Sequence, residues 1–312
     1  MINLNRKTEL MEKCRYTGFG TKIIRRPLYN HEPTLGEAGR NPIENWYSFH
    51  REGHKEPLTV RSGSFQILQD EQVLDHALAF EEASGGDLII KQAGTWSNGG
   101  VVFVELASDN LFNIGGRGDD AIQASYILVN GHDGSRAFSG SPFTKRLFCQ
   151  NQLPALFARR RSLGFRVLHR HISDHMQNVE DAVRNFGECI NKARIMFEKL
   201  ADSPAPSRDV LRHWLTNQYM QDYQPPVENL EALNRYNRRS AEAINNMLVT
   251  FDQESSMFGS TKWIMFNSYT KWLQHESGRL TDSNRRHQRN VIGIGAYGSC
   301  QAANAAMELI AA

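Results

Sequence analysis

Apolar residues between Leu58 and Cys149 fall into short segments that are separated by Gly, Ser, Asp and Asn. Short segments rich in Val, Ile, Phe and Thr are typical of β-strands. Two stretches, Ser97-Asn98-Gly99-Gly100 and Asn130-Gly131-His132-Asp133-Gly134, supply the positive φ values that tight hairpins require, so we expect a mostly antiparallel sheet. We predict strands at Leu58–Arg61, Ser64–Gln69, Leu88–Ala93, Val101–Ala107, Ala121–Asn130, Ser135–Ser139 and Phe143–Cys149.

Helical spacing appears once inside this region and dominates after it. Val73, Leu74, Ala77 and Phe80 recur at three and four residues, which predicts a helix over 71–82 that interrupts the sheet. After Leu153 the same period predicts helices over 179–200, from 207 with Ser207 as the cap, over 230–251, over 263–273 and over 299–312. Ser203-Pro204-Ala205-Pro206 and Pro225-Pro226 separate the first three of these.

The order of these patterns predicts an α+β fold, with a sheet region first and a helical region after it. We expect an N-terminal extension over 1–57, with one short helix near Glu9 to Arg15, because its residues are polar and show little period. The β-rich domain is expected over 58–155. A helical region over 156–312 is expected to pack on the sheet.

Composition narrows the class of protein. The 312 residues include 40% hydrophobic and 22% charged residues, and the formal net charge is +2, as in an ordinary globular protein. The four cysteines form no C-x-x-C pair, which disfavours a zinc ribbon and suits a reducing compartment. The N-terminus lacks the apolar core of a signal peptide and no apolar run has the length of a membrane span, so the cytoplasm is the expected location.

Charge is unevenly distributed along the chain. No Asp or Glu occurs between Asp133 and Asp174, although this window holds eight Lys and Arg residues with phenylalanines between them. Such a run is often an ordinary solvated surface. Clustered cations beside aromatic rings are also what single-stranded nucleic acid sites use. We predict phosphate contacts for seven of these residues, which are Lys145, Arg146, Arg159, Arg160, Arg161, Arg166 and Arg170. Phe143, Phe148 or Phe157 are candidates for stacking on bases, although a core position is expected for each taken singly.

The other motifs give weaker evidence of function than this basic window. Gly293-Ile294-Gly295-Ala296-Tyr297-Gly298 matches a dinucleotide-binding pattern, but the chain ends at Ala312, before the second strand and the acidic residue that this fold needs. His169, His171 and His175 lie beside arginines, which disfavours a cation site and favours structural or phosphate-contacting roles. No P-loop, nucleophile elbow or H-E-x-x-H sequence occurs, and no cofactor is expected.

Several blocks of the sequence resemble a known family. These are Val60 to Gln69, Gln92-Ala93-Gly94-Thr95 with Gly99-Gly100, Tyr126 to Ser135, Thr144 to Asn151, the basic stretch near Arg170-His171, and Gly259 to Trp263 with Asn267 to His275. Together they resemble the phage/plasmid-like domain of unknown function of the DUF932 type, over roughly residues 45 to 300 and in the family's order. Leu147 and Phe148 stand at positions where valine is more common in the family. The resemblance implies a phage or plasmid origin and assigns no activity.

The order of a β-rich half, a basic segment and a helical region is similar to that of single-strand annealing proteins of phages and of the eukaryotic recombination mediator superfamily. This analogy implies a non-enzymatic protein that binds and anneals single-stranded DNA as a homo-oligomeric ring or filament, without nucleotide hydrolysis. A phage nuclease or a single-strand binding protein would be a further partner, and no membrane would be involved.

Two other functions remain open from the sequence. One is a metal-dependent nucleic-acid enzyme that uses Asp119, Asp120 and Asp133 as oxygen ligands. The other is a virion component or a host-directed inhibitor, whose basic run would meet an acidic surface of a protein partner.

Overall fold

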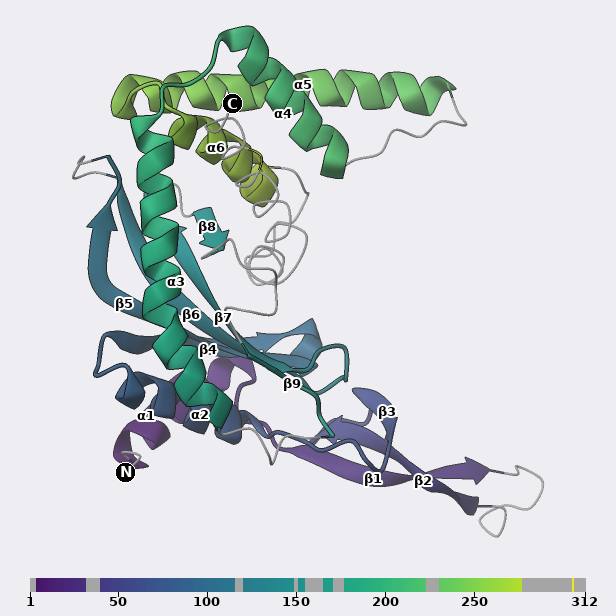
Figure 1. Ribbon diagram of the computed structural model, residues 1–312. Helices are drawn as coiled ribbons and strands as arrows, with labels where there is room; N and C mark the ends of the chain where they lie inside the picture. Colours follow the sequence, from purple (N-terminus) through teal and green to yellow (C-terminus); the bar gives the residue numbers. More distant parts are fainter. Residues whose placement is uncertain are drawn as a thin grey trace. The chain divides into compact units, whose positions relative to one another are not determined.

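Strands form two sheets in the computed structural model, which describes residues 4–31, 40–115, 120–148, 151–154, 165–170, 177–222 and 230–276, together with Ala305 (Figure 1). The strands are β1 (Ile23–His31), β2 (Arg40–Arg51), β3 (Thr59–Ser62), β4 (Leu88–Trp96), β5 (Val101–Asn113), β6 (Ala121–Gly131), β7 (Phe138–Arg146), β8 (Asn151–Pro154) and β9 (Phe165–Val167). One sheet has the order β1-β2-β3. The other has the order β4-β5-β6-β7-β8, and β9 pairs with β7.

Helices precede, interrupt and follow these strands in the chain. They are α1 (Leu4–Cys14), η1 (Arg15–Thr17), α2 (Asp70–Ala83), η3 (Ser97–Gly99), α3 (Gln177–Asp202), α4 (Arg208–Asp222), α5 (Leu230–Phe258), α6 (Lys262–Lys271) and the π-helical turn η5 (Trp272–Glu276). The fold is therefore α+β, as the sequence predicted. None of the helices that the structure describes is long and apolar enough to cross a membrane.

Most of the helices were predicted from the sequence. Those expected over 71–82, 179–200, 230–251 and 263–273 are confirmed as α2, α3, α5 and α6, and α4 follows Ser207. The short helix expected near Glu9 to Arg15 begins earlier, at Leu4, as α1. The helix predicted over 299–312 lies, apart from Ala305, outside the described residues, as does the glycine pattern over 293–298.

The chain divides into two compact units that do not follow chain order. Unit 1 comprises Met1–Asp109, Ser125–Pro142 and Ala158–Gly187, and unit 2 comprises Asn110–Ala124, Phe143–Phe157 and Glu188–Ala312. The long strands β5, β6 and β7 and the helix α3 each contribute residues to both units.

The core of unit 1 forms between α2 and one face of the second sheet. Val73, Leu74 and Phe80 of α2 are buried with alternate residues of β5 and β6, and the rings of Phe80 and Tyr126 stack with centroids 4.2 Å apart. Ala182 from the first part of α3 joins this cluster. The helical period of α2 and the alternation along the strands produce this packing, since each buries one face.

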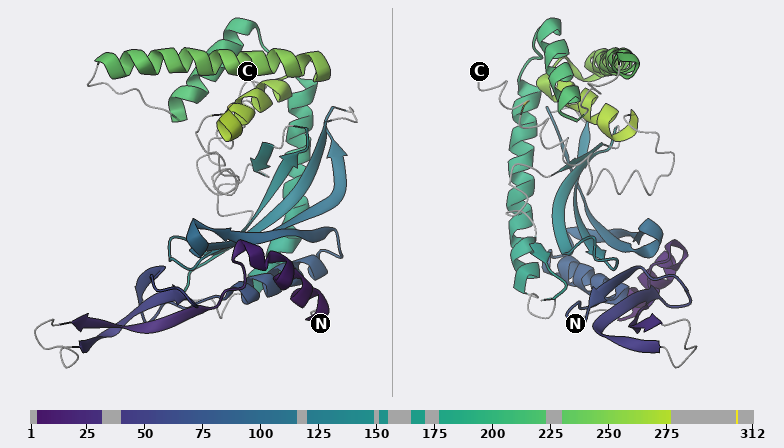
Figure 2. Two further views of the ribbon diagram at one scale, coloured as in Figure 1. Left: turned by 180° about the vertical axis from the view of Figure 1, so that it is seen from behind. Right: turned by 90° about the vertical axis from the view of Figure 1, so that its right-hand side faces the viewer.

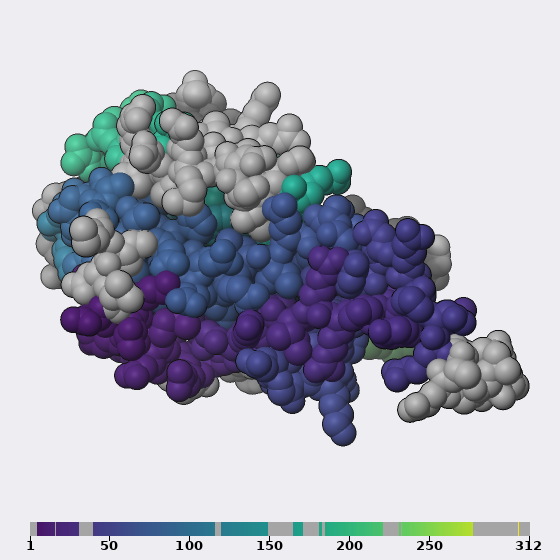
Figure 3. All heavy atoms as spheres, turned by 90° about the horizontal axis from the view of Figure 1, so that it is seen from below, coloured from purple at the N-terminus to yellow at the C-terminus, as the bar shows by residue number. Residues whose placement is uncertain are grey.

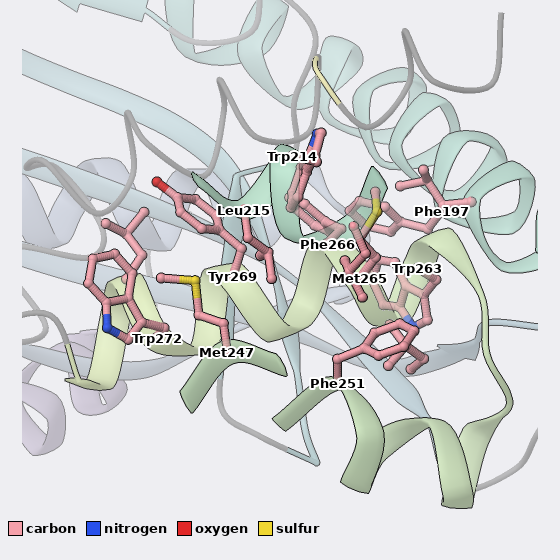
Figure 4. Packing of buried hydrophobic residues seen from close by; sticks show 14 of the residues in the cluster. Phe197, Trp214, Leu215, Met247, Phe251, Trp263, Met265, Phe266, Tyr269 and Trp272 are labelled. Carbon is pink, nitrogen blue, oxygen red and sulfur yellow. The ribbon is translucent and has the colours of Figure 1, made fainter. Parts of the chain in front are cut away.

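Unit 2 has a core of its own, built from aromatic and aliphatic residues of the helices. Figure 4 shows side chains from α3, α4, α5 and α6 pointing toward one another. Trp263 and Phe266 belong to α6, a helix that is buried on nearly all sides. Thr261 caps this helix by accepting a hydrogen bond from the backbone N–H of Ile264.

Three features of the β region differ from the sequence prediction. Residues 65–69, expected as a strand, are irregular because the backbone N–H of Gln66 donates to the carbonyl of His169 and the carbonyl of Leu68 accepts from the amide of Asn130. The strands expected at 135–139 and 143–149 are one strand, β7. Strands β1 and β2 lie in the segment expected to be an extension with one short helix and no strands.

Candidate nucleic-acid interface

The ribbon formed by β1 and β2 is the most exposed regular structure in unit 1. The two strands pair antiparallel from Ile23 opposite Arg51 to His31 opposite Arg40, and the left-hand view of Figure 2 shows them running together away from α1 and α2. Residues 40–46 of β2 are exposed, whereas residues 48–51 are buried. The ribbon is therefore anchored at one end, and the described residues cover neither face of its outer part.

Several side chains on this ribbon are cationic or aromatic. Arg25, Arg26 and Arg40 are exposed, and Glu44 is the acidic residue among the described positions of β1 and β2. The guanidinium of Arg25 lies 3.3 Å from the ring centroid of Tyr47. That of Arg40 lies 5.4 Å from the ring centroid of Tyr29. Stacking on a ring leaves the N–H groups of a guanidinium free to donate in its plane, which suits phosphate binding.

The buried end of the ribbon holds it to the body of unit 1. Phe49 is fully buried and meets Phe65 edge to face at 5.1 Å, and Phe65 stacks on His169 at 4.4 Å. The guanidinium of Arg51 donates to the carbonyl of Gly18. The side-chain amide of Gln69, just before α2, donates to the carbonyl of Ile23 and accepts from its backbone N–H. It thus makes the two hydrogen bonds that a neighbouring strand would otherwise make with Ile23.

A second exposed basic position lies at β9, on the edge of the larger sheet. Arg166 lies opposite Ser139 of β7 and points to solvent, while Phe165 and Val167 on either side of it are buried. Arg170 is also exposed. Two of the predicted phosphate contacts therefore stand at the surface of unit 1. No carboxylate of the described residues pairs with them or with Arg25, Arg26 and Arg40.

The turn between β6 and β7 links the ribbon sheet to β9. Arg61 of β3 donates to the carbonyl of Asp133, and the ring nitrogens of His169 lie 3.0 Å from the carbonyls of Gln66 and Arg136. Burial lowers the pKa of His169, against the opposing effect of these carbonyl contacts. The basic groups of the ribbon and of β9 are thus carried by one connected part of unit 1. Figure 3 shows the face of the molecule at which the purple and indigo N-terminal residues reach the surface.

A buried Asp–His pair supports the same turn from inside. Asp70 at the start of α2 and His132 in the turn are almost fully buried, with Oδ1 and Nε2 2.6 Å apart. The other carboxylate oxygen of Asp70 accepts from the backbone N–H of Gly20 at 2.8 Å. The pair therefore joins the N-terminal segment, α2 and the turn. The motif Asn130-Gly131-His132-Asp133-Gly134, interpreted from the sequence as a hairpin, also supplies this internal contact.

Arg146 has a different setting from the exposed one that phosphate binding requires. Its side chain is fully buried in unit 2, where it pairs with Asp120 through Nε and Nη2 and with Glu254 through Nη1. Three rings, those of Phe148, Phe258 and Trp263, lie 5.1–5.6 Å from the guanidinium carbon. A guanidinium committed to two carboxylates has no edge left for DNA, so Arg146 does not belong to the interface.

The other predicted site residues are distributed as follows. Lys145 is half-buried on β7, opposite Gln152 of β8. Arg159, Arg160, Arg161 and Phe157 lie outside the described residues, so their roles stay predictions. Phe143 is buried, whereas Phe148 is 46% exposed and meets Phe258 edge to face.

The carboxylates considered as metal ligands are occupied in other ways. Both oxygens of Asp120 accept hydrogen bonds, from Arg146 and from the indole N–H of Trp263 at 2.7 Å. Asp133 accepts from the backbone N–H of Ser135, and Asp119 lies outside the described residues. Across the part of the chain that the structure describes, no group of three His, Cys, Asp or Glu residues could hold a metal ion.

Sequence reasoning missed the ribbon, although a signal was present. Arg25-Arg26 and Trp46-Tyr47 combine adjacent cations with adjacent rings inside segments that contain Ile and Phe. Pro27 and Pro42 interrupt any alternation there. A ribbon exposed on both faces also shows no apolar period, which is the main signal for a strand.

Comparison with known proteins gives one family and no individual relative. No curated protein and no solved structure matches the chain. The family match begins at residue 57, so β1 and β2 lie N-terminal to it. With residues 57–292 of the 312 matched by its family model, the chain belongs to the family described as Domain of unknown function (DUF932).

Proposed function

We propose that this protein binds and anneals single-stranded DNA as a homo-oligomer, without nucleotide hydrolysis. The observation that carries the proposal is the set of exposed arginines on unit 1 that lack a carboxylate partner among the described residues. Those on the β1–β2 ribbon and at β9 are Arg25, Arg26, Arg40, Arg166 and Arg170. Exposed arginines on a protein surface commonly pair with acidic neighbours, as Arg208 pairs with Asp252 here. A set left unpaired is available to phosphates.

Aromatic rings among these cations favour single-stranded over double-stranded DNA. Tyr29, Trp46 and Tyr47 lie on the same ribbon as three of the arginines. Rings stack on bases only where the bases are unpaired, and such stacking tolerates any sequence. Sequence-independent binding is what annealing requires, because the protein must hold strands of any sequence with their bases accessible.

Oligomerisation follows from the length of DNA that annealing must hold. Unit 1 of a single copy offers only a short basic surface. Several copies along a DNA strand would therefore be needed to keep that strand extended. The expected assembly is the ring or filament that the analogy with single-strand annealing proteins implies. A phage nuclease or a single-strand binding protein would supply or cover the strand.

The test is fluorescence anisotropy of a labelled oligothymidine, titrated with protein across a salt series. We expect log K to fall against log salt with a slope of about −3 or steeper, at about −0.7 per phosphate contact on a single strand. Replacing Arg166 and Arg170 with Ala should make the slope shallower by about 1.4. The matched control replaces Arg194 and Arg238, which are exposed on α3 and α5 and lie near Glu198 and Glu242. It removes the same charge and should leave the slope unchanged.

Two results would overturn the proposal. The first is no binding at low salt with or without magnesium, after which an acidic protein partner becomes the function to test. The second is an equal loss of slope in both double variants, which would mean that only net charge matters. Annealing itself is measured by energy transfer between complementary labelled strands in the absence of ATP, and mass photometry with DNA gives the assembly.

A further inference from the structure

Trp46 is the exposed tryptophan of this chain. Trp46 is 46% exposed, whereas Trp96, Trp214, Trp263 and Trp272 are 2–6% exposed and belong to the cores. All five tryptophans of the sequence lie within the described residues. An indole left in water costs hydrophobic free energy that folding normally recovers, so a tryptophan held at the surface of a regular strand calls for an explanation.

The strand places Trp46 and Tyr47 on opposite faces of the ribbon, because successive side chains alternate. The ring of Tyr47 is already covered by Arg25 at 3.3 Å. Among the described residues, ring stacking and cation–π contacts involve Tyr47 and not Trp46. The two aromatic residues are therefore not equivalent, because the indole of Trp46 lies under no such cation.

The neighbours of Trp46 toward the anchored end of the ribbon are cationic, apolar or neutral. Trp46 pairs with Ser62 of β3, and the next pair along the same face is Ser48 with Val60 on one side and Arg26 on the other. Arg26 and Val60 are exposed, and no carboxylate lies at these positions. An apolar ring beside an unpaired guanidinium is complementary to a nucleotide, whose base is flat and apolar on its faces and whose phosphate is anionic.

Toward the outer end, Glu44 is the acidic residue that precedes Trp46 on β2. Asn45 between them has a φ of 60°, in the left-handed region, and the register with β1 shifts between Pro27 and Tyr29. Such an irregularity interrupts the alternation of side chains along a strand. Alternation therefore does not place the carboxylate of Glu44 on the face of Trp46.

We infer that Trp46 stacks on an unpaired nucleobase while Arg26 contacts the adjoining phosphate, so that the β1–β2 ribbon is a base-holding arm. This inference rests on the proposed function and adds to it the residue that contacts the bases. It concerns a part of the chain that precedes the family match at residue 57. Bases stacked within a duplex cannot reach the indole, so the arm distinguishes single strands from double strands.

Tryptophan emission tests the inference directly, because Trp46 is the fluorophore open to solvent. Titration with oligothymidine should quench the emission and reduce its accessibility to iodide. A duplex, or an abasic oligonucleotide of the same length, should change it much less. Replacing Trp46 with Phe should abolish the change in iodide accessibility while retaining most of the affinity, since the phenyl ring still stacks.

Affinity measurements complete the test. Trp46→Ala should weaken oligothymidine binding by about fivefold or more, and should leave binding to the abasic oligonucleotide within about twofold of wild type. The control is Val249→Ala, which removes another exposed apolar side chain, 51% exposed on α5. It should change neither affinity. Circular dichroism should show both variants folded, because each changed residue is at the surface.

The outcomes separate this inference from the proposed function. If no oligonucleotide binds, the proposed function fails and the inference fails with it. If oligothymidine binds but Trp46 emission is unchanged, or if Trp46→Ala weakens the abasic and the natural strand equally, the proposed function stands and the inference is wrong. If emission shifts with protein concentration in the absence of DNA, Trp46 lies against a second copy, and that result also overturns it.

Discussion

Arg146 of unit 2 and the arginines at the surface of unit 1 have opposite surroundings. In unit 2, Arg146 is fully buried between Asp120 and Glu254 and three aromatic rings. In unit 1, Arg26 and Arg166 stand in solvent without a carboxylate partner in the described structure. A buried ion pair stabilises only when every charge is matched, whereas an exposed unpaired cation contributes little to stability and remains available for a ligand. The number of arginines in a sequence window therefore does not measure a binding surface, because the partners of each one decide its role.

The largest effect we expect is from removing the buried guanidinium. Arg146→Met leaves Asp120 and Glu254 buried and without their main partner, which should cost about 3–5 kcal/mol of unfolding free energy. Chemical denaturation measures this cost. The control, Arg194→Met, changes an exposed arginine whose nearest carboxylate oxygen, on Glu198, is 3.6 Å away, and should change stability by less than about 0.5 kcal/mol.

DNA binding by the same variant sharpens the contrast. Folded Arg146→Met protein, assayed well below its melting temperature, should bind oligothymidine with the wild-type salt slope. If the variant had normal stability and a shallower salt slope, Arg146 would contact phosphate and would belong to the interface.

The turn between β6 and β7 is the part of unit 1 that should tolerate change least. A Cβ on Gly131 would lie 2.8 Å from the backbone N and O atoms of Arg136, and backbone cannot move aside as a side chain end can. Gly131→Ala should cost about 1–3 kcal/mol. Gly187→Ala is the control, since nothing lies within 4 Å of its Cβ and alanine favours helix α3, so its stability should be unchanged or higher by up to about 1 kcal/mol. Equal stability of the two variants would mean that the turn adapts.

Periodicity was sufficient to predict most of the regular structure. Helix α2 and the strands β4, β5 and β6 each bury at least one face, so the spacing of their apolar residues predicted them. The glycines of the turns predicted the hairpins. The ribbon bears no such period, because most of β2 is exposed on both faces. Strand β7 was divided in two at Gly140-Ser141-Pro142, since these residues are typical of turns. Gly140 is needed there for space, because a Cβ would lie 2.6 Å from atoms of Tyr126 and Phe165.

The interface was harder to predict than the fold, because the exposure of a basic residue depends on partners that are distant in the sequence. The density of basic residues in a window does not fix the setting of any single one: Lys145 is half-buried, its neighbour Arg146 is fully buried, and Arg166 is exposed. Burial of Arg146 depends on Glu254, which lies 108 residues further along the chain. No local pattern contains that contact, whereas the exposure of Arg166 follows from simple alternation with Phe165 and Val167.

A pH titration probes unit 1 without any change of sequence. Burial lowers the pKa of His76 in α2, whose Nδ1 is buried and has no hydrogen-bond partner among the described residues. The folded chain then binds fewer protons than the unfolded chain, in which histidine has its ordinary pKa of about 6.5. Stability should be constant above about pH 7 and should fall as the pH decreases through that value toward the lower pKa of the folded state. His169, whose pKa is lowered in the same way, adds to the effect.

Denaturation at about pH 7.5 and at about pH 5 measures this loss, and His76→Phe should reduce it. The phenyl ring keeps the contact with Phe138, whose ring centroid lies 4.9 Å from that of His76, but it cannot take up a proton. An unchanged pH dependence in this variant would assign the effect to other groups.

The smallest effect on stability is expected from the arginines that matter most for the proposed function. Arg26→Ala combined with Arg166→Ala should change the unfolding free energy by less than about 0.5 kcal/mol, because neither side chain packs in a core or holds a carboxylate among the described residues. Reduced self-repulsion among neighbouring cations favours a slight gain over a loss. The same double variant should lose about 1.4 from the salt slope of oligothymidine binding. A large loss of stability would place these arginines in the same class as Arg146, and the contrast between Arg146 and the arginines of unit 1 would disappear.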